Sequence, residues 1–259
     1  MTSTTLKIFA LILMLIDHIA QFIPGIPIWL HWIGRLSAPL FIYTMVWGLH
    51  YTHDRKKYLK RIYFFGCGMA VIDLILNNII KNPYSPITNN IFVMFFLIGV
   101  IVSIKEYKKE NPIKGKKIMV KFIIFQLLST IICVLGMIFV PLNSSIMLIS
   151  ALFPNLIFCE GSFIFVLLGV LLYYFKDTKI ITVKAYGIFC IAYFLISLSC
   201  GRNLNHLLFV DYQWMMIASL PLMLCYNGKK GQGLKYLFYF FYPIHIVILY
   251  LIGNFIFLK

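Results

Sequence analysis

The stretch that decides the fold is K-I-F-A-L-I-L-M-L-I-D-H-I-A-Q-F, residues 7–22. It is an apolar run with Lys7 at its start and with Asp17 and His18 deep inside it. A charged side chain at the centre of a membrane helix costs about 2.5–3.5 kcal/mol, so this pair marks a candidate functional site. Lys7 and His18 lie on one helix face with a rise of about 16 Å between them. This spacing suits a long anionic substrate, although a snorkelling lysine and a structural histidine explain it equally well.

The composition places the chain among integral membrane proteins. Of its 259 residues, 61% are hydrophobic and only 12% are charged, and the mean hydropathy is +0.91. We therefore predict an all-α, polytopic helical bundle that forms one transmembrane domain over residues 1–259, located in the cell membrane. We expect about nine spans (eight to ten), with the N-terminus cytoplasmic, near residues 6–23, 30–51, 59–80, 88–104, 119–140, 160–176, 182–200, 206–225 and 234–257. The apolar residues 146–158 are too short for a further span and are expected to be re-entrant or interfacial.

The net charge of +15 does not indicate nucleic acid. In this topology the 23 Lys and Arg residues fall in cytoplasmic loops, with the exceptions of Arg35, Lys81, Arg202 and Lys259. Such a distribution follows the positive-inside rule and predicts a lipid bilayer as the partner of the basic loops. The six cysteines form no C-x-x-C pair, so no zinc site and no other metal site is expected.

The second predicted span carries the next polar group. His31 and Arg35 are four residues apart and share a helix face, and Arg35 lies too deep to be a simple anchor. Asp17 and His18 point about 100° apart around their helix, so Asp17 cannot orient His18 directly. We expect Asp17 to pair with Arg35 instead. Pro39 cannot donate to the carbonyl of Arg35 and predicts a kink there.

Further polar residues within the predicted spans are candidates for binding a substrate. Asp73 and Glu160 either line a cavity for an acceptor or pair with Lys81 and Arg202. His245 is more often a hydrogen-bonding residue within a bundle than a second base. The candidates for substrate binding are His31, Asp73, Asn90, Glu160, Tyr242 and His245, of which Tyr242 and Asn90 are also possible donors to an oxyanion.

A basic run, D-R-K-K-Y-L-K-R, occupies residues 54–61. Cations beside a membrane most often set the orientation of the protein and contact anionic lipid. The less common use is to hold phosphate groups, for which lysine and arginine are well suited. Both interpretations stay open from the residues alone.

Several of these stretches together resemble one family. They are L-K-I-F-A-L-I-L-M-L-I-D-H-I (6–19), I-G-R-L-S-A-P-L-F (33–41), the basic run, Y-N-G-K-K-G (226–231) and K-Y-L-F-Y-F-F-Y-P-I-H-I-V-I-L (235–249). They resemble the TraX family of integral membrane proteins, which is named for the F-pilin N-acetyltransferase. The layout is also similar to the acyltransferase-3 superfamily, in which a histidine on the first helix is catalytic.

The resemblance implies an acetyltransferase that takes acetyl groups from cytoplasmic acetyl-CoA. The acceptor would be an amine or hydroxyl of a pilin-like peptide or of a cell-surface glycan. His18 would be the general base, assisted by Asp17 and Arg35. The phosphates of acetyl-CoA would be held by Lys7, Arg55, Lys57, Lys60 and Arg61.

Two other classes of protein fit the same residues. A transporter or proton-coupled channel would use Asp17, His18, Arg35 and Glu160 as a relay, although no inverted repeat is visible. A non-catalytic membrane assembly factor would need none of them for chemistry. Binding of acetyl-CoA separates the enzyme from both.

Overall fold

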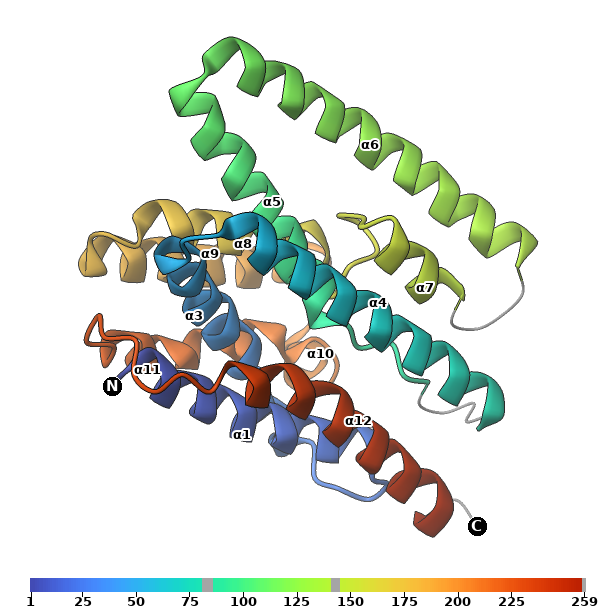
Figure 1. Ribbon diagram of the computed structural model, residues 1–259. Coiled ribbons are helices and arrows are strands. Elements are labelled where there is room, and N and C mark those ends of the chain that lie inside the picture. Colours follow the sequence, from blue (N-terminus) through green and yellow to red (C-terminus); the bar gives the residue numbers. More distant parts are fainter. Residues whose placement is uncertain (81–85, 141–144, 258–259) are drawn as a thin grey trace. The chain divides into compact units, whose positions relative to one another are not determined.

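The computed structural model describes residues 1–80, 86–140 and 145–257, and within these ranges every regular element is a helix. The chain forms two compact units (Figure 1). Unit 1 comprises Met1–Gly48 and Leu171–Lys259, and unit 2 comprises Leu49–Val170. The prediction of one domain over residues 1–259 therefore stays a prediction, and each unit is described by itself.

Unit 1 is organised around its first helix, α1, which packs against α2 on one side and α12 on another. Its elements are α1 (Ser3–Phe22), α2 (Trp29–Gly34), most of α3 (Ser37–Tyr51), the end of α8 (Ser162–Phe175), α9 (Lys179–Ser199), α10 (Leu204–Phe209), the 3₁₀ helix η1 (Tyr212–Ser219), α11 (Leu220–Leu224) and α12 (Lys235–Phe257). The helices α1 and α12 run side by side in the same direction, as Figure 1 shows.

The buried positions of α1 explain this packing. Leu6, Ala10, Met14, His18 and Phe22 recur every four residues and are all buried, so they form one continuous stripe. Near the end of the stripe, Gly253 of α12 lies directly against the backbone of Phe22. A glycine is needed there because it lets the two helices approach closely.

The start of α1 is fixed by the segment that precedes α12. Thr2 caps the helix through its side chain, and the N–H groups of Ser3 and Thr4 donate to the carbonyl oxygens of Lys229 and Lys230 at 2.9 and 3.1 Å. The free N–H groups of the first helical turn are thus satisfied. This arrangement brings Lys230 to the end of α1 that carries Lys7.

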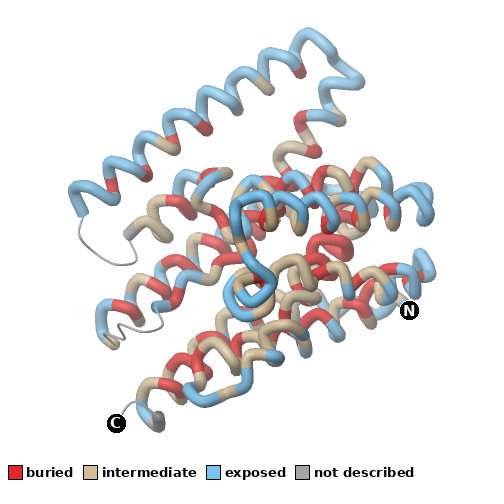
Figure 2. Tube along the Cα trace, turned by 180° about the vertical axis from the view of Figure 1, so that it is seen from behind, coloured by how far each residue is buried: buried red, intermediate tan, exposed pale blue. Residues whose placement is uncertain are grey.

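Unit 2 contains α4 (Arg55–Ile79), α5 (Ile91–Glu110), α6 (Pro112–Phe139), α7 (Ser145–Leu152) and most of α8. The helices α4 and α5 pack antiparallel, and α7 packs on both α4 and α6. Most of α6 is exposed, as the pale blue tube in Figure 2 shows. Because α6 is also strongly apolar, its exposed surface is suited to lipid.

Within the described part of the chain, five helices are long and apolar enough to cross a membrane. They are Ser3–Phe22, Arg55–Ile79, Pro112–Phe139, Lys179–Ser199 and, within α12, Tyr236–Phe255. The predicted class of an all-helical membrane protein is confirmed for the described residues. The count of about nine spans and the cytoplasmic N-terminus stay predictions.

Two predicted spans are interrupted in the structure. Residues 30–51 are interrupted by a turn at Arg35 and Leu36, so Pro39 falls in the first turn of α3, where its missing N–H is harmless. The expected kink is therefore a break between two helices. Residues 206–225 do not form one helix but divide among α10, η1 and α11.

The segment 146–158 contains only the eight-residue helix α7, which at about 12 Å is too short to span a bilayer. The irregular residues that follow are held by α6. The side chain of Gln126 donates to the carbonyl of Pro154 at 3.0 Å and accepts from the N–H of Leu156 at 2.9 Å. These hydrogen bonds satisfy polar groups of the irregular backbone within the protein, as its place among apolar helices requires.

The contact at Gly253 yields the first prediction. A Cβ atom there would lie 2.0 Å from the carbonyl oxygen of Phe22, which is backbone and cannot move aside. We expect Gly253→Ala to lower the stability of the detergent-solubilised protein by about 1–3 kcal/mol, measured as a lower thermal midpoint. Gly68→Ala in α4 is the control, since its Cβ would meet nothing within 4 Å. Equal midpoints for the two variants would contradict the close approach of α1 and α12.

Candidate functional site

Two histidines from opposite ends of the chain meet inside unit 1. Nδ1 of His18 on α1 lies 2.7 Å from Nε2 of His245 on α12, and the two rings stack with their centroids 4.9 Å apart. Both residues are buried, with exposed fractions of 4% and 5%. A buried hydrogen bond between imidazoles fixes both rings relative to each other.

The partners of these rings define their tautomers. Nδ1 of His245 lies 2.6 Å from the carbonyl oxygen of Phe241, which can only accept, so this nitrogen carries the hydrogen. In a neutral His245 the other nitrogen, Nε2, then accepts, and His18 must donate to it from Nδ1. It follows that neutral His18 has its lone pair on Nε2, which makes this atom the basic nitrogen of the pair.

Aromatic side chains surround the two histidines. The ring of Tyr242 stands edge-on to both imidazoles, with centroid distances of 6.3 Å to His18 and 5.9 Å to His245. Phe22 lies 6.1 Å from His18, and Phe241 stacks on His245 at 4.8 Å. Of the predicted substrate-binding residues, Tyr242 and His245 thus lie beside His18.

The second group is centred on Asp17. Nη2 of Arg35 lies 3.0 Å from both carboxylate oxygens of Asp17, and Nδ1 of His31 lies 2.8 Å from one of them. The predicted pair of Asp17 and Arg35 is confirmed, and His31 joins it. Gly34 makes this possible, since a Cβ there would lie 2.3 Å from Cβ of Asp17. The carboxylate therefore faces α2, while His18 on the same helix faces α12.

Two residues of the 3₁₀ helix η1 complete the group around Asp17. Arg35 donates from Nη1 to Oε1 of Gln213 at 3.2 Å, and its guanidinium lies 5.1 Å from the centroid of the Tyr212 ring. The same ring stacks on His31 at 5.6 Å. No pattern in the sequence marks Tyr212 or Gln213, because neither belongs to a motif.

Lys7 lies on the same side of α1 as His18, as its spacing predicts. Its Nζ atom is 5.4 Å from the ring centroid of Phe238 on α12, the helix that also carries His245. Lys230 lies near enough to act on it electrostatically. Among the described residues neither lysine forms a salt bridge, so two cations gather at one end of α1.

The remaining predicted site residues belong to unit 2. Asp73 on α4 and Asn90 before α5 are buried, and Glu160 accepts from the N–H of Asn90 at 2.8 Å. The predicted phosphate-binding residues occupy the first two turns of α4, after the capping residue Asp54. These are Arg55, Lys57, Lys60 and Arg61. Their role stays a prediction.

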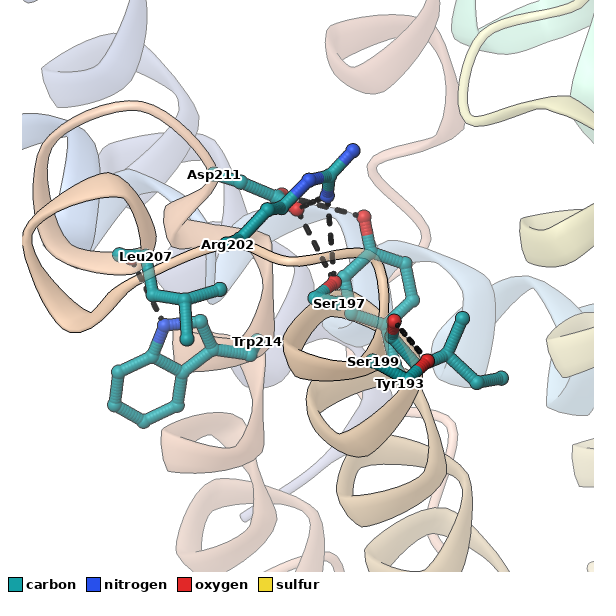
Figure 3. A network of polar contacts seen from close by, with 8 residues as sticks. Tyr193, Ser197, Ser199, Arg202, Leu207, Asp211 and Trp214 are labelled. Atoms are coloured by element: carbon teal, nitrogen blue, oxygen red, sulfur yellow. Dashed lines mark hydrogen bonds and ion pairs between the residues drawn. The ribbon is translucent and has the colours of Figure 1, made fainter.

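One alternative for Arg202 is a pair with Asp73 or Glu160, whereas the structure gives it a carboxylate partner within unit 1. It pairs with Asp211, and Tyr193 and Ser197 also donate to that carboxylate at 3.5 and 3.1 Å (Figure 3). The other expected partner, Lys81, lies outside the described residues. The Arg202 network ties α9 to the segment before η1 and has no need of a substrate.

The fold and the site define an integral membrane protein with a buried histidine pair and a half-buried ion pair around its first helix. The chain belongs to the TraX family, described as "TraX protein", whose model matches residues 2–253. One relative is a probable fimbrial assembly protein, FimC of serogroup H1, from Dichelobacter nodosus. It is 25% identical over 266 residues, covering 94% of this chain and 92% of the relative. No solved structure is significantly similar.

The ion pair yields the second prediction. Arg35→Ala removes the arginine partner of the half-buried Asp17 carboxylate and leaves it only His31, and we expect a loss of about 1–3 kcal/mol in stability. The double variant Asp17→Ala/Arg35→Ala should lose less than the sum of the single variants, with a coupling of about 0.5–3 kcal/mol. The measurement is chemical denaturation of the purified protein.

The exposed pair of Glu106 and Lys109, whose charged groups lie 3.1 Å apart, is the matched control. Lys109→Ala should change stability by less than about 1 kcal/mol. Strictly additive effects of the Asp17 and Arg35 variants would show that the two residues do not stabilise each other.

Proposed function

We propose that this protein is a membrane acetyltransferase. It moves an acetyl group from cytoplasmic acetyl-CoA to an amine or hydroxyl of a pilin-like or cell-surface acceptor. The observation that carries the proposal is the chain of hydrogen bonds from the Phe241 carbonyl through His245 to His18, which leaves a lone pair on Nε2 of His18. A neutral imidazole held in one orientation is suited to general base catalysis.

In this proposal His18 moves one proton in each turnover. Nε2 takes the proton of the acceptor amine or hydroxyl as that group attacks the thioester carbon and forms the new N–C or O–C bond. The same proton passes from Nε2 to the CoA sulfur as the C–S bond breaks. His18 ends neutral, as it began, so no other proton donor is needed.

His245 is a positioning residue, because it acts through His18. Its Nε2 atom accepts the Nδ1 hydrogen of His18 and holds the ring, while its own Nδ1 is held by Phe241. Asp17 is bound by Arg35 and His31, yet it is near enough to act electrostatically on His18. A neighbouring carboxylate stabilises the imidazolium that forms during transfer.

The acetyl donor fits the two cations at the end of α1. Lys7 and Lys230 gather positive charge without a carboxylate partner among the described residues, which suits the phosphates of CoA. From Lys7 to His18 the rise is about 16 Å, a distance that the pantetheine arm can cover. The basic residues Arg55, Lys57, Lys60 and Arg61 are a second candidate for phosphate binding.

The relative's description as a fimbrial assembly protein favours a pilin-like acceptor over a glycan. It fits a non-catalytic assembly factor equally well, and that function would survive the loss of His18. A transporter that uses Asp17, His18, Arg35 and Glu160 is the other alternative. Neither alternative requires acetyl-CoA, so binding of this compound distinguishes the enzyme from both.

The third prediction assigns the chemistry. With radiolabelled acetyl-CoA and a pilin-derived peptide, His18→Ala should lower the rate of acetyl transfer by about 100- to 10,000-fold. His18→Gln should be equally inactive, because an amide cannot take a proton near neutral pH. Acetyl-CoA binding should change little in both variants. Wild-type turnover in His18→Ala would contradict the mechanism.

His245 tests the positioning role separately. His245→Ala should lower the rate strongly, whereas His245→Gln should recover part of it, since the glutamine oxygen can accept the Nδ1 hydrogen of His18. A general base at His245 would instead leave both variants equally inactive.

The fourth prediction concerns the donor. Lys7→Gln/Lys230→Gln should weaken acetyl-CoA binding on the order of tenfold in a detergent titration, because two charges near the phosphates are lost. Lys57→Gln/Lys60→Gln tests the basic residues of unit 2 in the same way. Lys114→Gln/Lys116→Gln, at exposed positions of α6, is the control and should bind normally. Unchanged binding in both test variants would exclude these lysines as the phosphate site.

A further inference from the structure

Asp73 is a buried carboxylate of unit 2 that the proposed acetyl transfer does not use. Its exposed fraction is 0%, and neither of its carboxylate oxygens has a hydrogen-bond partner among the described residues. A charged group inside a membrane protein is costly unless it is paired, so such a carboxyl group either carries a proton or faces a positive charge that the described residues do not supply.

The surroundings of Asp73 are defined by two contacts on the same face of α4. Asn77 exchanges two hydrogen bonds with the backbone of Ile87, at 2.8 and 2.9 Å. Asn90 donates from Nδ2 to the carbonyl oxygen of Gly66 at 2.9 Å. Gly66, Asp73 and Asn77 are all buried on this face, so residues 87–90 run along it past Asp73.

Two further hydrogen-bond acceptors belong to the surroundings of Asp73. The N–H of Asn90 donates to Oε2 of Glu160 at 2.8 Å, and Oδ1 of Asn90 has no partner among the described residues. Asn90 is itself only 5% exposed. The charge of Glu160 acts on Asp73. A carboxylate and an amide oxygen, both buried and both lacking a donor, thus lie in the field of a second carboxylate.

The described cations of unit 2 lie elsewhere. They are at the start of α4, the end of α5 and the start of α6, whereas the acceptors lie in the second half of α4 and before the first residue of α5. Along α4 the nearest of them, Arg61, is about 18 Å from Asp73, and along α5 Lys105 is about 22 Å from Asn90.

We propose that unit 2 binds a small, singly charged cation at Asp73, Asn90 and Glu160. An alkali-metal ion and a primary ammonium group share the required chemistry, since each presents one positive charge to oxygen acceptors. The three N–H groups of an ammonium match three acceptor groups, and an alkali ion takes the same oxygens as ligands. This site is independent of the histidine pair, which belongs to unit 1.

The test is cation-dependent stability of the full-length protein. The thermal midpoint is measured in N-methylglucamine buffer at constant ionic strength while sodium, potassium or methylammonium chloride is titrated in. We expect a saturable rise on the order of 5 °C with at least one of these cations. The cation that raises the thermal midpoint most shows whether the site binds an alkali-metal ion or a primary ammonium group.

The variants locate the site. Asp73→Asn should abolish the rise, because a neutral amide offers the cation no negative charge. Glu160→Gln should increase the half-saturating concentration about tenfold, which keeps the test informative if Asp73→Asn does not fold. Asp177→Asn is the control, because that carboxylate is exposed and should leave the response unchanged.

Four results would overturn the proposal. The first is a midpoint that no monovalent cation changes, and the second is an equal rise in the wild type and in Asp73→Asn. The third is a loss of stability in Lys81→Gln that Asp73→Asn restores, which would mean that the chain supplies its own cation. A thermal midpoint that rises with magnesium or calcium alone would contradict the proposal that the bound cation carries a single positive charge.

Discussion

The hydrogen bond between His18 and His245 is the interaction on which unit 1 depends. It joins α1 and α12, and it pairs two buried ring nitrogens, Nδ1 of His18 and Nε2 of His245, with each other. Around it, the stripe from Leu6 to Phe22 and the close approach at Gly253 hold α1 and α12 side by side. Because the Phe241 carbonyl fixes the hydrogen on Nδ1 of His245, the same contact that stabilises the helix pair also decides which nitrogen of His18 is basic.

Asp17 and His18 are neighbours in the sequence but have separate partners. Arg35 and His31 on and beside α2 hold the carboxylate, while α12 holds the imidazole. This division follows from helix geometry, since adjacent residues point about 100° apart. Asp17 therefore does not orient His18 as the carboxylate of a serine protease triad orients its histidine. In this protein the carbonyl of Phe241, acting through His245, orients His18. Asp17 acts on His18 only through its charge.

Helix geometry and hydropathy predict much of this arrangement from the sequence. The apolar runs predict the helical class, and the spacing of Lys7 and His18 predicts that they share a helix face. Because few cations fall inside the predicted spans, Arg35 is the obvious partner for Asp17. Other features depend on contacts between distant segments, which local patterns do not contain. Nothing in Y-P-I-H indicates that His245 meets α1, and nothing in Y-N-G-K-K-G indicates that Lys230 approaches Lys7. No sequence pattern marks Gln213. The break at Arg35 was also missed, because Pro39 suits a kink within a helix as well as the first turn of a new one.

The central claim concerns the tautomers of one histidine pair, and nitrogen-15 NMR of histidine-labelled protein tests it most directly. Comparison with His18→Gln and His245→Gln assigns the signals of the two rings. The account predicts that near neutral pH both residues are neutral and carry their hydrogen on Nδ1, with a lone pair on Nε2 of His18. A hydrogen on Nε2 of His18, or a permanently charged ring at either position, would contradict it.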